Sequence, residues 1–186
     1  MATSRKSRAS TKGLEDLFLD GLKDVYYAEK KILKALPKMA KGAESEEVAA
    51  AFEKHEAETE AQVERLEQVF GLLDKAARGK TCPAIDGILE EGSEILEEYK
   101  SAPALDAGLV AAAQAVEHYE IARYGTLIAW AEQLGMTEAV ELLIKAGAAH
   151  EAERMIVIGV CMQHFGKLLH GIFRSTLREQ QVCPLD

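Results

Sequence analysis

Proline and aromatic residues are scarce in this chain of 186 residues, which has four prolines and an aromatic content of 6%. Alanine, leucine, glutamate and lysine dominate instead, and no run of β-branched residues indicates a strand. We therefore predict an all-α fold. With 48% apolar residues, a chain of this length can form one domain of ordinary size around a single core.

Cysteines are few, and long apolar runs are absent. Cys82, Cys161 and Cys183 form an odd set without CxxC spacing, which excludes a disulfide framework or a zinc-finger signature and indicates free thiols. The N-terminus lacks the apolar segment of a signal peptide, and no apolar stretch is long enough to span a membrane. We expect a soluble, cytoplasmic protein without a membrane partner.

Positive charge at the N-terminus contrasts with an acidic remainder. The chain has a formal net charge of −9, although residues 1–13 contain four basic and no acidic residues. An acidic body argues against a broad nucleic-acid-binding face. We interpret residues 1–13 as a disordered basic tail; a DNA-binding arm is the alternative.

Apolar residues recur at steps of three and four residues in four long segments, as in amphipathic helices. Ser45 is the expected N-cap of the second helix, and Pro83 begins a shorter helix in the connection between the second and third. The domain should span residues 14–178, with a frayed end at 179–186. The long helices are expected at about 14–41, 45–74 and 103–134, and from 137 onward.

Loop lengths indicate how these helices pack. Short loops join the first helix to the second and the third to the fourth, so each pair should form an antiparallel hairpin. The connection over about 75–102 is long enough to cross the bundle. Two hairpins joined by one long crossover form a ferritin-like four-helix bundle, here with a short extra helix in the crossover. The alternatives are a simple up-down-up-down bundle and an α-solenoid, although the sequence shows no fixed short-period repeat.

Acidic residues interrupt the inward stripes of these helices. Glu117 and Glu120, three residues apart, share a helix face with apolar residues. Buried carboxylates usually shift their pKa, pair with a cation or bind a metal. Counting residues from each interhelical loop places further acidic and histidine side chains at the same depth, near mid-bundle. The candidate metal ligands are Glu29, His55, Glu58, Glu117, Glu120, His150 and Glu153.

This set resembles the dinuclear carboxylate sites of four-helix bundles, in which two helices each give one Glu and two give a Glu-x-x-His pair. Here both pairs have the reverse order, His55-x-x-Glu58 and His150-x-x-Glu153. One or both histidines could therefore orient carboxylates instead of binding metal. For any single pair, an ordinary ion pair on the helix surface is the simpler alternative. Tyr124 lies on the same stripe, where aromatic residues more often serve packing; the alternative is that it donates a hydrogen bond or relays electrons near the metals.

Several motifs add a family resemblance. They are the Asp24–Ala40 segment around Glu29, the His55-x-x-Glu58-Thr-x-x-Gln62 run, the Lys80-x-Cys82 element and the Ala112–Gly125 segment. Together they resemble the YciF-like branch of the ferritin-like superfamily over about residues 14–158. The resemblance implies a dinuclear metal centre, often a dimer, and a role in bacterial stress response. It extends to Glu29, His55, Glu58, Gln62, Glu117 and Glu120, and is weaker around His150 and Glu153.

We therefore expect a centre of two metal ions, with iron preferred and manganese as the alternative, since both accept this set of oxygen and nitrogen ligands. Such a protein would oxidise Fe(II) or reduce O2 or peroxide, with Glu58 and Glu120 as the catalytic carboxylates. It would act as a homodimer. The alternatives are manganese-dependent peroxide dismutation and a structural or interaction protein with a vestigial metal site.

Overall fold

The computed structural model describes residues 11–147, and within this range every regular element is a helix. None of the helices in this range combines the length and apolar character needed to cross a membrane. The helices are α1 (Leu14–Gly42), α2 (Glu46–Leu72), α3 (Pro83–Glu98), α4 (Leu105–Gln133) and a helical segment over residues 137–147.

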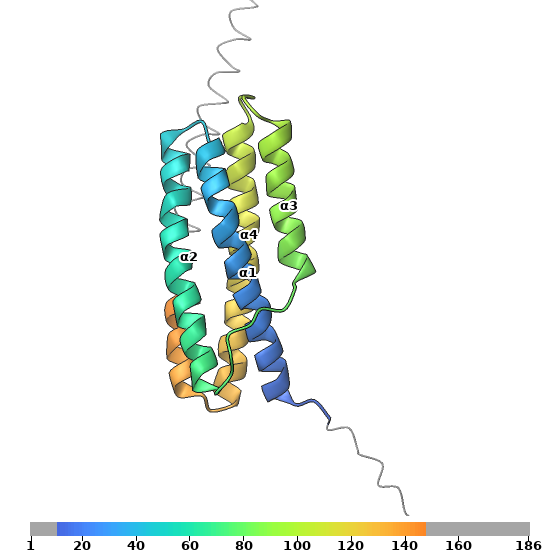
Figure 1. Cartoon of the computed structure of the whole chain (residues 1–186), viewed down its shortest axis with the longest axis vertical. Coiled ribbons are helices and arrows are strands. Elements are labelled where there is room, and N and C mark those ends of the chain that lie inside the picture. Colours follow the sequence, from blue (N-terminus) through green and yellow to red (C-terminus); the bar gives the residue numbers. More distant parts are fainter. Residues whose placement is uncertain (1–10, 148–186) are drawn as a thin grey trace, which may run out of the picture.

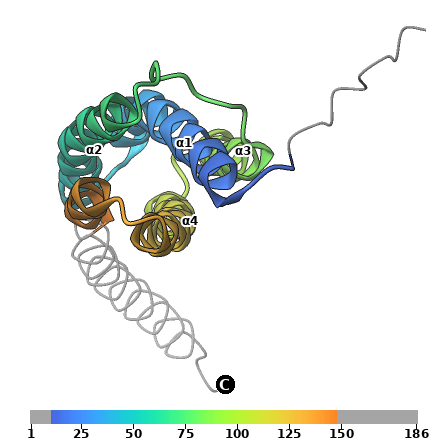
Figure 2. The ribbon, with the colours of Figure 1, turned by 90° about the horizontal axis from the view of Figure 1, so that it is seen from below.

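The helices form the ferritin-like arrangement (Figure 1). α1 and α2 are antiparallel neighbours, and α4 forms a second antiparallel pair with the 137–147 segment. The crossover leads from the end of α2 back along the bundle to the start of α4, so α2 and α4 run in the same direction. α3 packs outside, against α1 and α4, as the view along the bundle shows (Figure 2). The all-α prediction is confirmed.

The core consists of two apolar clusters, one at each end of the bundle. The lower cluster of Figure 1 includes Phe18, Leu66 and Leu127, and the upper cluster includes Ile32, Phe52 and Leu109. Buried polar side chains belong to neither cluster. Six of them are Glu29, His55, Thr59, Gln62, Glu117 and Glu120, each at most 6% exposed.

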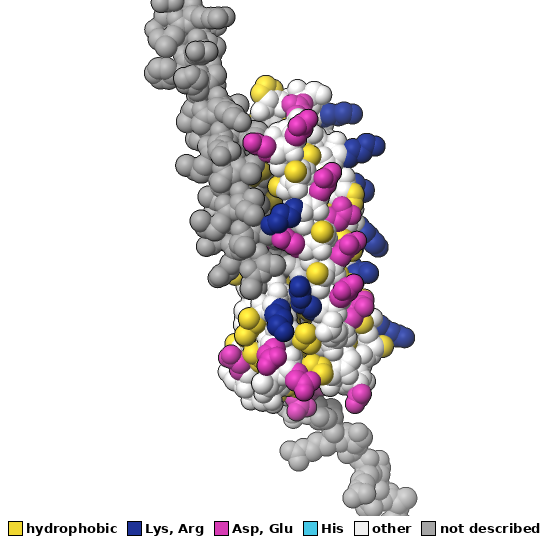
Figure 3. Space-filling view, turned by 90° about the vertical axis from the view of Figure 1, so that its left-hand side faces the viewer, with side chains coloured by type: hydrophobic (Ala, Val, Ile, Leu, Met, Phe, Trp, Pro, Cys, Tyr) yellow, Lys and Arg dark blue, Asp and Glu magenta, His cyan; other side chains and the backbone are white. Residues whose placement is uncertain are grey.

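The outer surface is charged. Acidic side chains are distributed along the face on the α2 side, and lysine and arginine side chains gather along one edge of it (Figure 3). Apolar side chains on this face are scattered instead of forming one patch. The apolar side chains of the amphipathic helices therefore serve mainly the core.

The turn between α1 and α2 is held by a residue far away in the sequence. Ser45 occupies the N-cap position of α2 as expected, but its side chain makes no capping hydrogen bond. Instead, the Asp106 carboxylate of α4 accepts hydrogen bonds from the backbone N–H groups of Glu44, at 2.9 Å, and Ser45, at 2.8 Å. A negative charge at a helix N-terminus is stabilising. This contact joins the two hairpins at the upper end of the bundle.

The crossover is anchored to α1 and α4 at several points. The Lys80 N–H donates to the Lys23 carbonyl at 3.0 Å, and the Tyr27 hydroxyl donates to Asp86 of α3 at 2.9 Å. Cys82 Sγ lies 3.3 Å from the Tyr119 hydroxyl. Cys82 is a buried free thiol, as predicted; Cys161 and Cys183 lie outside the described residues.

Gly79 lets the crossover backbone approach α1 closely. A Cβ atom at this position would lie 2.9 Å from Tyr27 Cβ and 3.1 Å from Tyr27 Cα, so the backbone would have to move. We expect Gly79→Ala to lower the free energy of unfolding by about 1–3 kcal/mol, as overpacking does. Gly71→Ala is the control, because nothing lies within 4 Å of a Cβ there. Chemical denaturation measures both, and equal stabilities would contradict the close packing.

Candidate metal centre

Three helices bring the candidate ligands together in the middle of the bundle. Glu29 comes from α1, His55 from α2, and Glu117 and Glu120 from α4. Glu29 and Glu117 have no exposed surface, and Glu120 is 1% exposed. Because Glu117 and Glu120 are one helical turn apart, both carboxylates face inward from α4.

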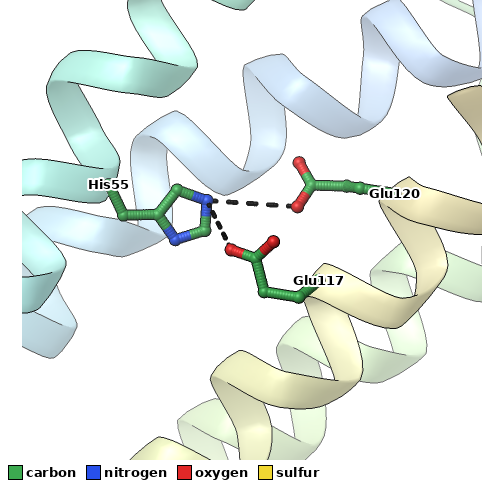
Figure 4. A group of neighbouring side chains, drawn as sticks. All are labelled: His55, Glu117 and Glu120. Atoms are coloured by element: carbon green, nitrogen blue, oxygen red, sulfur yellow. Dashed lines mark ion pairs between the residues drawn. The ribbon is translucent and has the colours of Figure 1, made fainter. Parts of the chain in front are cut away.

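His55, Glu117 and Glu120 form a compact group (Figure 4). His55 Nε2 lies 3.3 Å from Glu117 Oε1 and 4.0 Å from Glu120 Oε2. One ligand atom of each residue lies within 4.8 Å of the others, so the three could hold one metal ion between them. The short distance to Glu117 is compatible with either role expected for His55, as a ligand or as a group that orients a carboxylate.

Glu29 joins this group through hydrogen bonds. The buried Tyr124 hydroxyl donates to Glu29 Oε1 at 2.7 Å. Burial, and then the negative charge and hydrogen bond of Glu29, raise the pKa of Tyr124, which favours a neutral phenol that can donate. Glu29 also lies close enough to Glu120 to raise the pKa of Glu120 through its charge and through hydrogen bonding. Tyr124 was expected to serve packing; it does lie in the lower core cluster, but its hydroxyl also holds a carboxylate of the site.

Burial and the neighbouring carboxylates raise the proton affinity of Glu120. Burial is the main cause that raises the pKa of Glu120 well above its ordinary value, followed by the charges of Glu29 and Glu117 and the hydrogen bond to Glu29. Each of these effects disfavours the ionised form. In the absence of a cation, the group therefore favours a protonated Glu120 that shares a hydrogen bond with Glu29.

The donor set suits a divalent metal ion. Buried carboxylate oxygens and an imidazole nitrogen are ligands for iron and manganese, and a cation would offset the negative charge that burial makes costly. Glu58 of α2 adds a further observation. Glu58 Oε1 forms an ion pair with Lys54 Nζ at 3.0 Å. Glu58 Oε2, in contrast, is buried and has no hydrogen-bond partner among the described residues. Such an oxygen is available to a cation.

The structure brings only part of the predicted ligand set together. Glu58 is half-buried and is not part of the group formed by His55, Glu117 and Glu120. His150 and Glu153 lie outside the described residues, so their part in the site stays a prediction. His118, next to Glu117 in the sequence, is exposed.

The fold and these side chains define the class of protein: a ferritin-like helical bundle with buried residues that could hold a metal ion. Comparison with known proteins then identifies the family. The chain belongs to the family described as Domain of unknown function (DUF892), which matches residues 13–156. The YciF-like resemblance is thereby confirmed.

Three comparisons illustrate this relationship. Protein YciF of Escherichia coli K12 is 46% identical over 134 residues, which cover 71% of this chain and 80% of that protein. The crystal structure of the E. coli stress protein YciF superposes with a TM-score of 0.81 at 38% identity, covering 84% of this chain and 99% of the other. YcfI of Rhodopseudomonas palustris gives a TM-score of 0.77 at 46% identity, covering 82% and 97% of the respective chains.

The raised pKa of Glu120 predicts how the metal-free protein responds to pH. A group with a raised pKa in the folded state stabilises that state below its unfolded pKa, and this contribution is lost as pH rises through the folded pKa. Glutamine mimics the protonated form at every pH. We expect Glu120→Gln to raise the Tm of metal-free protein by several degrees at about pH 8 and by less at about pH 5.

Thermal unfolding in the presence of a chelator measures this difference. Glu132→Gln, at an exposed position on the same helix, is the matched control and should follow the wild type at both pH values. A Glu120→Gln effect that is independent of pH would contradict the assignment of Glu120 as a carboxylate destabilised by ionisation.

Proposed function

We propose that the protein is a dinuclear-metal oxidoreductase, with iron as the preferred metal, that oxidises Fe(II) or reduces O2 or peroxide in protection against stress. The observation that carries the proposal is the buried group of His55, Glu117 and Glu120, whose ligand atoms lie within 4.8 Å of one another, with Glu29 hydrogen-bonded beside it. The E. coli relative is itself named a stress protein.

The stability of the fold does not require this group of buried polar side chains. Three buried carboxylates and an imidazole cost desolvation free energy that an apolar stripe of the same helices would not, because charged groups lose their hydration on burial. The polar side chains also separate the two apolar clusters of the core. A bound divalent cation would turn the mutual repulsion of the carboxylates into shared attraction, which explains why the three occur together.

Each side chain has a distinct task in this proposal. Glu117 and Glu120 present carboxylate oxygens from α4, Glu29 presents one from α1, and His55 supplies nitrogen from α2 or orients Glu117. Tyr124 fixes the orientation of Glu29 through its 2.7 Å hydrogen bond. His150 and Glu153 are proposed to complete the second metal position. The surrounding apolar clusters limit access of water to the site.

The chemistry comes from the metal. When bound, two Fe(II) ions would supply two electrons, which with two protons would convert one peroxide molecule to two waters, or one O2 molecule to peroxide. The carboxylates of Glu29, Glu117 and Glu120 would favour the ferric state, since negative oxygen ligands stabilise the higher positive charge. Glu120 can release its proton when the cation binds, because the cation removes the cause of its raised pKa.

A structural role is the second candidate, since the name of the R. palustris relative proposes a structural protein. In that case the acidic group would hold a metal without redox turnover, or would hold none. Metal content and reactivity separate these candidates.

We expect the purified protein to bind Fe(II) and to oxidise it in the presence of O2 or peroxide. Glu120→Gln and Glu117→Gln should each lower metal affinity by at least about 10-fold, because each removes an anionic ligand. Elemental analysis, isothermal titration with Fe(II) under nitrogen and stopped-flow oxidation measure these effects. Glu132→Gln, exposed on α4, is the control. Stoichiometric metal without oxidation would favour the structural candidate, and Mn(II)-dependent peroxide dismutation would identify manganese as the working metal.

A further inference from the structure

A small cavity lies inside the bundle next to the candidate metal centre. It has a volume of about 30 Å³ and is lined by residues of all four labelled helices. Within residues 11–147, His55 is the one polar side chain in its lining, and it is also a member of the group formed with Glu117 and Glu120. The cavity and the candidate metal centre are therefore neighbours that share a residue.

The apolar lining decides what the cavity can hold. A buried water needs two to four polar partners and a volume of roughly 10–15 Å³, and apolar cavities stay dry and bind apolar molecules instead. Here the volume is sufficient, but among the described residues the lining offers no polar side chain besides His55. Peroxide, which hydrogen-bonds through both oxygens, would exchange its several water contacts for a single polar partner, His55. A diatomic apolar molecule forms no strong hydrogen bonds with water, so it loses none when it enters the cavity.

The cavity also continues toward the surface. A groove between α1 and α3 shares Ala35, Met39 and Leu89 with the cavity lining. Its outer part carries charged side chains, among them Lys34 of α1 and Glu90 of α3. Exposure falls along this path, since Ala35 and Leu89 are half-buried, whereas His55 at the inner end is 6% exposed.

We propose that this cavity is the binding site and access path through which dioxygen reaches the metal centre. The inference rests on the proposed function and deepens it, because it assigns dioxygen instead of peroxide to the path between α1 and α3. The Met39 side chain, flexible and 8% exposed, lies where the groove and the cavity meet, and its movement would open the path.

Gly92 on α3 provides the means to test this proposal. A Cβ atom at Gly92 would lie 3.4 Å from Ala112 Cβ and 3.5 Å from Met39 Cε, which are ordinary contacts with two residues of the lining. Alanine would therefore fit without a clash and take up space in the cavity. It would also favour the helix, since glycine lowers helix stability relative to alanine. Gly87, exposed on the same helix with nothing within 4 Å of its Cβ, provides the matched control.

The experiment uses dioxygen itself as the probe. Full-length protein is prepared from zinc-supplemented, iron-poor medium so that any bound metal is diamagnetic, and methyl NMR relaxation is recorded under O2 pressure. We expect stronger relaxation enhancement at the cavity methyls of Ile32 and Leu109 than at Leu66 and Val69 of the lower core cluster. Gly92→Ala should reduce this enhancement several-fold at equal or higher Tm, while Gly87→Ala should leave it unchanged.

A second measurement links the cavity to reactivity. In single-turnover oxidation of Fe(II), Gly92→Ala should slow the reaction with O2 several-fold relative to Gly87→Ala and leave the reaction with hydrogen peroxide unchanged. Ala35→Leu, at the half-buried junction of groove and cavity, is a second variant with the same expected effect should Gly92→Ala not fold.

Two results would overturn the proposal: no selective relaxation of the cavity methyls in the wild type, or, in protein that oxidises Fe(II), equal O2 rates in the two glycine variants. A wild type that oxidises no Fe(II) would instead overturn the proposed function. The relaxation measurement would still decide whether the cavity binds dioxygen, because it needs no redox metal.

Discussion

The mutual repulsion of buried carboxylates is the constraint on which the arrangement of this bundle depends. Glu29, Glu117 and Glu120 are held in the interior with at most 1% exposure each, where an ionised carboxylate loses most of its hydration. Polar contacts offset part of this cost. The Tyr124 hydroxyl donates a hydrogen bond to Glu29, Glu29 interacts with Glu120, and His55 lies beside Glu117. A bound cation would offset the desolvation cost of the carboxylates more completely, and for this reason we interpret the group as a metal site.

The apolar parts of the bundle keep these side chains in place. One core cluster lies toward each end, so the helices cannot separate at mid-bundle to admit water without losing packing on both sides. Asp106 ties the α1–α2 turn to α4, and the crossover is fixed to α1 through Lys80 and Tyr27. These contacts connect the two hairpins, and the ligands come from both of them. The position of each carboxylate therefore depends on contacts distant from the site.

Periodicity in the sequence was sufficient to predict most of the helices. The first helix begins at Leu14 as expected, and Pro83 begins α3, because its missing N–H and fixed φ suit the first turn of a helix. Capping was predicted less well. Ser45 stands at the expected N-cap, but the acceptor that serves the N-terminus of α2 is Asp106, 61 residues away. No local pattern marks such a partner, since it depends on how the hairpins pack.

Residue spacing alone was enough to predict the all-α fold, the hairpin topology and the mid-bundle depth of Glu29, His55, Glu117 and Glu120, because helix period and rise convert spacing directly into face and depth. Which of these side chains meet depends on tertiary packing. In the folded protein, His55 lies against the two carboxylates of α4, and the Tyr124 hydroxyl donates a hydrogen bond to Glu29. Glu58 is half-buried beside Lys54. These outcomes depend on how far each helix is rotated about its axis and on side-chain rotamers, and neighbouring helices fix both only when they pack.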